Sequence, residues 1–148
     1  MFTVLNPAPA RPIGKEILQH VDLIVPNETE TTALTGINPK TEQEVREVYR
    51  QFATHGVKQL IITLGKRGCV HVCGDELQWH SARTVNAVDT TSAGDTFIGA
   101  VCTQLCRNIP IADAIEYASA CSAITVSRRG AAVSIPTAEE VEQYWRNA

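Results

Sequence analysis

The densest group of residues that could do chemistry is the segment DTTSAGDTFIGA, from Asp89 to Ala100. Gly94 and the small residues Ser92 and Ala93 let a ligand approach the backbone closely. The segment opens a predicted long helix, and the first amides and positive dipole end of a helix favour an anion such as phosphate. At the same helix start, the carboxylate of Asp95 can accept a proton from an attacking hydroxyl. The segment therefore predicts a phosphoryl-transfer site, although aspartate is also a favoured residue in a first helical turn.

Other nucleotide and metal motifs find no match in the sequence. It has no Walker A pattern, dinucleotide fingerprint or HExxH. The turn Gly65–Gly68 lacks the Ser or Thr that a P-loop places after its lysine. Cys69, His71 and Cys73 alternate along a predicted strand and share a face, but a metal site needs about four convergent ligands. We therefore expect buried thiols on apolar faces rather than a metal centre.

The composition is that of an ordinary soluble globular domain. The chain has 148 residues, of which 44% are hydrophobic and 20% charged, and its net charge is −3. With no block of Lys and Arg, neither nucleic acid nor an anionic membrane is an expected partner. No apolar run approaches the ~20 residues of a membrane span, and the N-terminus lacks the pattern of a signal peptide. The five cysteines are an odd number and suit a reducing compartment, so we expect a cytoplasmic protein.

Alternating strand and helix patterns surround these residues. The predicted strands are 2–5, 21–26, 60–63, 69–73, 77–81 and the strand-like 84–88, with Gly74 and Asp75 as a hairpin turn. The predicted helices are 28–35 before Gly36, one from the capping box Thr41-x-x-Glu44 to Gly56, one from the Asp89–Asp95 segment through Arg107, 111–126, and one after Thr137. The alternation predicts an α/β fold with a mostly parallel sheet, in which the chemically interesting residues follow strand ends.

The segment from Asp89 to Phe97 resembles the C-terminal signature of the ribokinase (PfkB) family of carbohydrate kinases. Further segments resemble successive motifs of that family in the same order: Asn6–Ala10, Pro26–Glu30, Ile62–Gly68 and Arg128–Ala131. The resemblance covers nearly the whole chain, but it matches only the C-terminal half of a family member. It implies a ribokinase-like three-layer α/β sandwich with the N-terminal lid portion missing. A first predicted strand that begins at residue 2 agrees with that expectation.

The resemblance also implies roles for individual residues. Asp95 is similar to the catalytic base that contacts and deprotonates the sugar hydroxyl, and the amides around Ser92, Ala93 and Gly94 are similar to the anion hole. The implied ATP-binding residues are Asn27, Thr63, Leu64, Gly65, Lys66, Arg67, Gly68, Gly94 and Ser119. Glu30 matches a residue associated with Mg²⁺, and Ser92 stands where many family members have glycine. The implied ligands of a K⁺ ion, mostly backbone carbonyls, are Asp89, Thr91, Thr125, Arg128, Gly130 and Ser134.

We therefore expect the intact protein to phosphorylate a pentose with ATP, Mg²⁺ and K⁺. The motifs Asn6–Ala10 and Pro26–Glu30 resemble ribokinase more than its fructokinase or adenosine kinase relatives, which favours D-ribose and its 5-hydroxyl. The implied sugar-gripping residues lie outside the chain, so a kinase for deoxyribose, another sugar or a nucleoside stays open. A truncated, non-catalytic nucleotide-binding or assembly module is the alternative of a different class. Because uncovered sheet edges and apolar helix faces favour self-association, we also expect a homo-oligomer.

Overall fold

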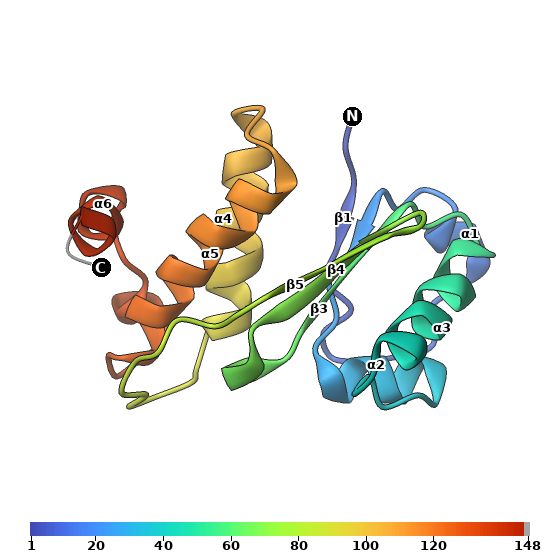
Figure 1. Cartoon of the computed structure of the whole chain (residues 1–148), viewed down its shortest axis with the longest axis horizontal. Coiled ribbons are helices and arrows are strands. Elements are labelled where there is room, and N and C mark those ends of the chain that lie inside the picture. The colour runs from blue at the N-terminus through green and yellow to red at the C-terminus, as the bar shows by residue number, and fades with distance from the viewer. Residues whose placement is uncertain (147–148) are drawn as a thin grey trace. The chain divides into compact units, whose positions relative to one another are not determined.

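The computed structural model describes residues 1–146 and divides the chain into two compact units. The first unit is Met1–His80 and contains all the strands of the described chain (Figure 1). The second unit begins at Ser81 and is helical. Each unit carries some of the residues singled out above.

A five-stranded sheet forms the centre of the first unit. In spatial order its strands are β1 (Val4–Leu5), β2 (Leu23–Ile24), β3 (Gln59–Thr63), β4 (Cys69–Cys73) and β5 (Glu76–His80). β1, β2 and β3 run parallel, while β4 and β5 form an antiparallel hairpin that continues from β3. The predicted hairpin with its turn at Gly74 and Asp75 is confirmed.

Three helices gather on one side of this sheet, namely α1 (Lys15–Leu18), α2 (Glu28–Thr35) and α3 (Glu42–Ala53) (Figure 1). α3 begins at the predicted capping box of Thr41 and Glu44, and its apolar residues Val45, Val48 and Phe52 are buried. They share a core with alternate residues of the central strands, including Leu60, Ile62, Val70 and Val72. The period of a helix and the period of a strand thus bring their apolar faces together.

The second unit is built on three helices, α4 (Ala93–Cys106), α5 (Ile111–Val126) and α6 (Ala138–Arg146), with a short 3₁₀ turn at Ala132–Ser134. α5 has the predicted bounds, and α4 and α5 lie side by side (Figure 1). α6 packs on α5 through Val141, Tyr117 and Tyr144. The helix α4 therefore packs against a second helix, α5.

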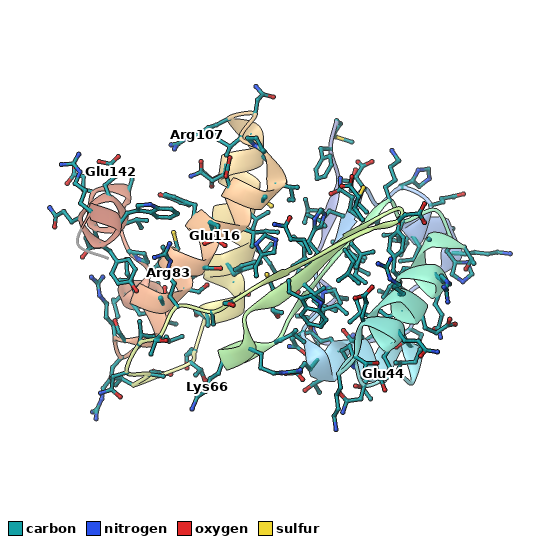
Figure 2. All side chains as sticks on the ribbon, in the orientation of Figure 1. Glu44, Lys66, Arg83, Arg107, Glu116 and Glu142 are labelled. Atoms are coloured by element: carbon teal, nitrogen blue, oxygen red, sulfur yellow. The ribbon has the colours of Figure 1, made fainter. Side chains whose placement is uncertain are left out.

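The prediction of a strand at residues 84–88 is wrong, because this segment is irregular and has no ladder partner among residues 1–146. It is held instead by α5, since the amides of Val88 and Asp89 donate to the carbonyl of Val126 at 2.7 and 3.1 Å. Arg83 anchors its beginning: the guanidinium lies 4.6 Å from the ring centre of Trp145 and one nitrogen lies 3.9 Å from a carboxylate oxygen of Glu116 (Figure 2). Side-chain contacts replace a β ladder here.

None of the helices in residues 1–146 combines the length and apolar character that a bilayer span requires. All five cysteines are free thiols. His71, on β4, is buried with its Nε2 atom 3.0 Å from Oε1 of Gln59, and this burial lowers the pKa of the imidazole. Within the described chain, no group of three or more His, Cys, Asp or Glu side chains is arranged to hold a metal ion.

Candidate active site

The start of α4 has an unusual local geometry. Ser92 occupies the N-cap position in the left-handed conformation, with φ 61° and ψ 10°, and its side chain makes no capping hydrogen bond. A serine in this conformation is strained, whereas a glycine is not. The amide of Ala93 donates to the carbonyl of Thr90 at 3.3 Å, while the amides of Gly94 and Asp95 have no hydrogen-bond acceptor among residues 1–146. The helix start therefore presents unsatisfied donors.

Asp95 occupies the third helical position of α4, the position that completes a capping box in three other helices. Asn27 with Glu30, Thr41 with Glu44, and Thr137 with Glu140 form such boxes at α2, α3 and α6. Asp95 does not: it is exposed, and none of the hydrogen bonds or ion pairs within residues 1–146 involves its carboxylate. The interpretation of Asp95 as a mere cap thus loses its structural support.

Gly94 follows the same logic. Its φ lies outside the left-handed region, and a Cβ atom added there would meet nothing within 4 Å in the described chain. A glycine inside a helix is less favourable than alanine by roughly 0.5–1 kcal/mol. Neither backbone conformation nor internal packing in the described chain explains a glycine here.

The loop before α4 is fastened by Asp89. One carboxylate oxygen accepts from the amide of Thr91 at 2.9 Å, and the other accepts from the amide of Gly130 at 3.1 Å. The hydrogen bonds from Thr91, followed by that from Gly130, lower the pKa of Asp89 to about 2. The carboxylate therefore joins the segment that leads into α4 to the segment that follows α5.

The remaining residues implied for a K⁺ site lie in the same part of the second unit. Thr125 is fully buried near the end of α5, and its carbonyl accepts from the amide of Arg128 at 3.1 Å. A side-chain nitrogen of Arg128 lies 2.7 Å from a carboxylate oxygen of Glu140 on α6. Ser134 is buried, and its hydroxyl donates to the carbonyl of Ala131 at 2.6 Å. Carbonyl and hydroxyl oxygens are hard donors of the type that an ion such as K⁺ prefers.

In the first unit, Asn27 and Glu30 form the capping box at the start of α2. The Asn27 side chain accepts from the amide of Glu30 at 2.8 Å, and the Glu30 carboxylate accepts from the amide of Asn27 at 2.8 Å. This box was not predicted from the sequence, although the spacing Asn-x-x-Glu carries the signal. The two residues implied for ATP and Mg²⁺ therefore also hold the start of α2.

The predicted nucleotide loop from Thr63 to Gly68 follows β3 and contains the 3₁₀ turn Gly65–Arg67. It lies beside the start of α2, because the amide of Thr63 donates to the carbonyl of Pro26 at 3.0 Å. An ion pair between Arg67 and Glu28 adds a second link. Lys66 is exposed in this loop (Figure 2). The carboxyl ends of β2 and β3 thus bring Asn27 and Glu30 close to the loop Thr63–Gly68. Glu28 links the two segments, and this contact was not predicted from the sequence.

The structure therefore gathers the predicted residues into two groups, one in each unit. The second group holds Asp89, Thr91, the α4 start and the end of α5. Ser119 lies half-buried in the middle of α5, and no contact in the described chain explains its proposed role. Thr96 and Ser122 were not singled out from sequence, yet they contact the elements that carry the site. Their signal is weak, since α4 also contains Thr103 and α5 also contains Ser119 and Thr125, and nothing in the spacing distinguishes the two residues.

Comparison with known proteins agrees with these motifs and this arrangement. The pfkB family carbohydrate kinase model matches residues 1–138. The chain belongs to the pfkB family of carbohydrate kinases, and its fold is the ribokinase-like α/β fold.

Three relatives illustrate the match. The ribokinase of Staphylococcus aureus is 46% identical over 142 residues, which are 95% of this chain and 47% of that protein. The crystal structure of a Thermotoga maritima ribokinase is 37% identical with a TM-score of 0.88, and covers 99% of this chain and 49% of its own. The Arabidopsis thaliana ribokinase complexed with ribose and ATP is 28% identical with a TM-score of 0.92, covering 97% of this chain and 47% of its own. The chain thus spans about half the length of these relatives.

Proposed function

We propose that this chain is the nucleotide-binding and catalytic part of an ATP-dependent sugar kinase, and that the intact protein phosphorylates D-ribose at its 5-hydroxyl. The proposal combines the family with the names of the relatives, which are ribokinases. One of them was solved with ribose and ATP, the two substrates that such a reaction needs.

The observation that carries the proposal is the state of Asp95. Its carboxylate is exposed in the first turn of α4, has no structural partner in residues 1–146, and adjoins amides without acceptors. A base beside unsatisfied donors suits the transfer of a phosphoryl group to a hydroxyl, because proton removal and charge stabilisation occur in one place.

In this mechanism Asp95 accepts the proton of the attacking sugar hydroxyl. The amides around Ser92, Ala93 and Gly94 form the anion hole for the charge on the migrating phosphoryl group. The proposed ATP-binding residues are Asn27 and the loop Thr63–Gly68 in the first unit, and Gly94 and Ser119 in the second.

A bound Mg²⁺ would neutralise charge on the phosphates, and Glu30 would be associated with it. We further propose that K⁺ binds near the anion hole and fixes its position. The proposed ligands are oxygens of Asp89, Thr91, Thr125, Arg128, Gly130 and Ser134. Turnover should then rise with K⁺ and fall when only Na⁺ or Li⁺ is supplied.

The test is a chimaera in which this chain replaces the matching residues of the Staphylococcus aureus ribokinase, assayed with ribose and ATP. Asp95→Asn should lower kcat by several orders of magnitude while ADP affinity stays near that of the parent. The matched control is Asp113→Asn, which changes an exposed carboxylate in the first turn of α5. An unaltered kcat in the Asp95 variant would remove this residue from the role of base.

A second candidate function is a non-catalytic nucleotide-binding or assembly module formed by this chain alone. It is favoured by the share of the relatives that the chain spans, 47% for the Staphylococcus aureus protein. For either candidate function we propose that the protein forms a homo-oligomer and lies in the cytoplasm. If the chimaera turns over and the chain alone does not, the chain by itself could still be either the catalytic part of a kinase or a module. If the chimaera binds nucleotide but shows no turnover, the module is favoured.

A further inference from the structure

The first turn of α4 lacks the features that normally fix a helix start. Its N-cap Ser92 is left-handed and its side chain makes no capping hydrogen bond, its second residue is Gly94, and the carboxylate of Asp95 is not used in a capping box. By contrast, α2 and α3 are closed by reciprocal capping bonds. Something else must hold the α4 start in one position.

Two hydroxyls of α5 contact this turn from the side. The hydroxyl of Ser122 donates to the carbonyl of Ala93, the first residue of α4, at 3.0 Å. One helical turn further along both helices, the hydroxyl oxygens of Thr125 and Thr96 lie 3.3 Å apart. Ser122 and Thr125 are three residues apart and so lie on one face of α5. Together they contact the first and the fourth residue of α4.

The Thr96–Thr125 pair is dry. Thr96 is 6% exposed and Thr125 is 0% exposed. The Thr125 oxygen also lies 3.0 Å from the carbonyl oxygen of Cys121. A hydroxyl has one hydrogen, so Thr125 donates to one of these partners at a time, and the Thr96 hydroxyl can supply the other bond. A buried hydroxyl is costly to leave unpaired, which makes the pair specific for one arrangement of the two helices.

We propose that Ser122, Thr125 and Thr96 are positioning residues, which hold the first turn of α4 and thereby the amides of Gly94 and Asp95 and the Asp95 carboxylate. None of the three hydroxyls contacts substrate in this role. The inference rests on the proposed function, because it assigns these residues a part in phosphoryl transfer.

The variants are Ser122→Ala and Thr125→Val, with Thr103→Val as the matched control. Thr103 lies on α4 itself and its hydroxyl donates to the carbonyl of Gly99 at 2.8 Å, but this bond is exposed and leads to no other element. Ser122→Thr and Thr125→Ser keep a hydroxyl and serve as rescue variants. Valine has the shape of threonine, so Thr125→Val removes the bond without opening a cavity.

The first readout is amide hydrogen exchange at Thr96 and Phe97 of the ligand-free chain, measured by NMR. The amide of Thr96 donates to the carbonyl of Ser92 at 2.9 Å, whereas the amides of Gly94 and Asp95 have no acceptor in the described chain that could protect them. Ser122→Ala and Thr125→Val should each speed this exchange about tenfold, and Thr103→Val and the rescue variants should leave it unchanged. Equal acceleration throughout α5, or none at the α4 start, would overturn the proposal. This readout needs no turnover, so its failure is distinct from failure of the proposed function.

The second readout is the split between kcat and KM in the chimaera described above. Both variants should lower kcat by about tenfold to a hundredfold with KM for ATP changed less than about twofold, because a displaced anion hole affects the reacting atoms more than the bound nucleotide. Faster exchange with an unaltered kcat would overturn the positioning role. A parent chimaera without any turnover would refute the proposed function and, with it, the part in catalysis assigned to these hydroxyls.

Discussion

At the scale of single residues, we expect Gly94 to lower the stability of α4 and to favour nucleotide binding. A Cβ atom at this position meets nothing in the described chain, and alanine is the better helix former. Gly94→Ala should therefore raise the free energy of unfolding by about 0.5–1 kcal/mol while weakening ADP binding, because a methyl group would occupy the space that a phosphate approaches. Urea unfolding and calorimetry with ADP measure the two effects.

Gly99 provides the control for that substitution. It lies on the same helix and is exposed, and a methyl group added at its Cα atom would likewise meet nothing within 4 Å in the described chain. Gly99→Ala should give the same gain in stability with no change in ADP affinity. Equal ADP affinity in both variants would show that nothing approaches the backbone at Gly94.

Asp89 makes the second unit sensitive to acid. Its pKa is about 2 in the folded chain, against roughly 3.9 for an unperturbed aspartate. A depressed pKa stabilises the folded state above the unfolded pKa, and this contribution disappears as the pH falls through the folded pKa. The difference in Tm between the parent and Asp89→Asn should be constant from pH 7 to about pH 5 and shrink toward pH 2. A difference that is constant over the whole range would contradict the bonds to Thr91 and Gly130.

The sequence indicated candidate residues for the site but not their contacts in the structure. The types and order of the residues from Ser92 to Asp95 predict an anion-binding helix start, and the structure has a helix start with unsatisfied amides there. The left-handed conformation of Ser92 could not be predicted, because serine prefers other conformations and only the surrounding structure imposes this one. The pairing of Arg67 with Glu28 depends on two parallel strands lying side by side, which no local pattern encodes.

At the scale of elements, the capping box of α2 allows the structural and the proposed functional roles of Glu30 to be separated. Glu30→Gln keeps an oxygen that accepts from the Asn27 amide but removes the charge. It should leave Tm nearly unchanged and weaken binding of Mg²⁺-ATP more than binding of ATP without the metal. Glu30→Ala should lower stability by about 1 kcal/mol as well. Calorimetry and thermal unfolding distinguish the two.

The control is the matching residue of α3. Glu44 closes the box with Thr41, and its pKa is lowered by the hydrogen bonds from Thr41 and Lys40. Glu44→Gln should therefore have no effect on nucleotide affinity. If Glu30→Gln behaves in the same way, Glu30 is only a cap.

The bounds of α2 and α5 were predictable from the local sequence. α2 was predicted from Glu28 to Thr35 because Gly36 ends it in the left-handed conformation, and α5 was predicted from Ile111 to Val126. α1 was missed because four residues give too little periodicity. The strand expected at residues 84–88 has strand-like residues but no neighbouring strand in the described chain, and pairing is a tertiary property.

At the scale of the whole molecule, the chain alone should bind ADP weakly, show no detectable ribose kinase activity and self-associate. The proposed nucleotide contacts belong to this chain, whereas the implied sugar contacts other than Asp95 lie outside it. Correct positioning of reactants contributes roughly 7–11 kcal/mol, so a sugar that is not held should not react measurably. Calorimetry with ADP and a coupled kinase assay measure the first two properties.

Self-association is expected from the surface of the first unit. β1 and β5 are edge strands, and Phe2 and Trp79 near them are 48% and 44% exposed. Open edges with exposed apolar side chains favour pairing with another chain. Light scattering should give a dimer or larger species. A monomer that phosphorylates ribose efficiently would contradict the proposal that the sugar contacts lie elsewhere.

The strand order of the first unit also determines how this unit can fold. β3, β4 and β5 follow one another through short turns and pair along five residues each. β1 and β2 pair only through two residues each, across connections that contain helices. Since closing a long connection costs entropy before pairing compensates it, the three-stranded meander should form early and nucleate the rest. β1 should join last, and it should be the first strand to detach on heating.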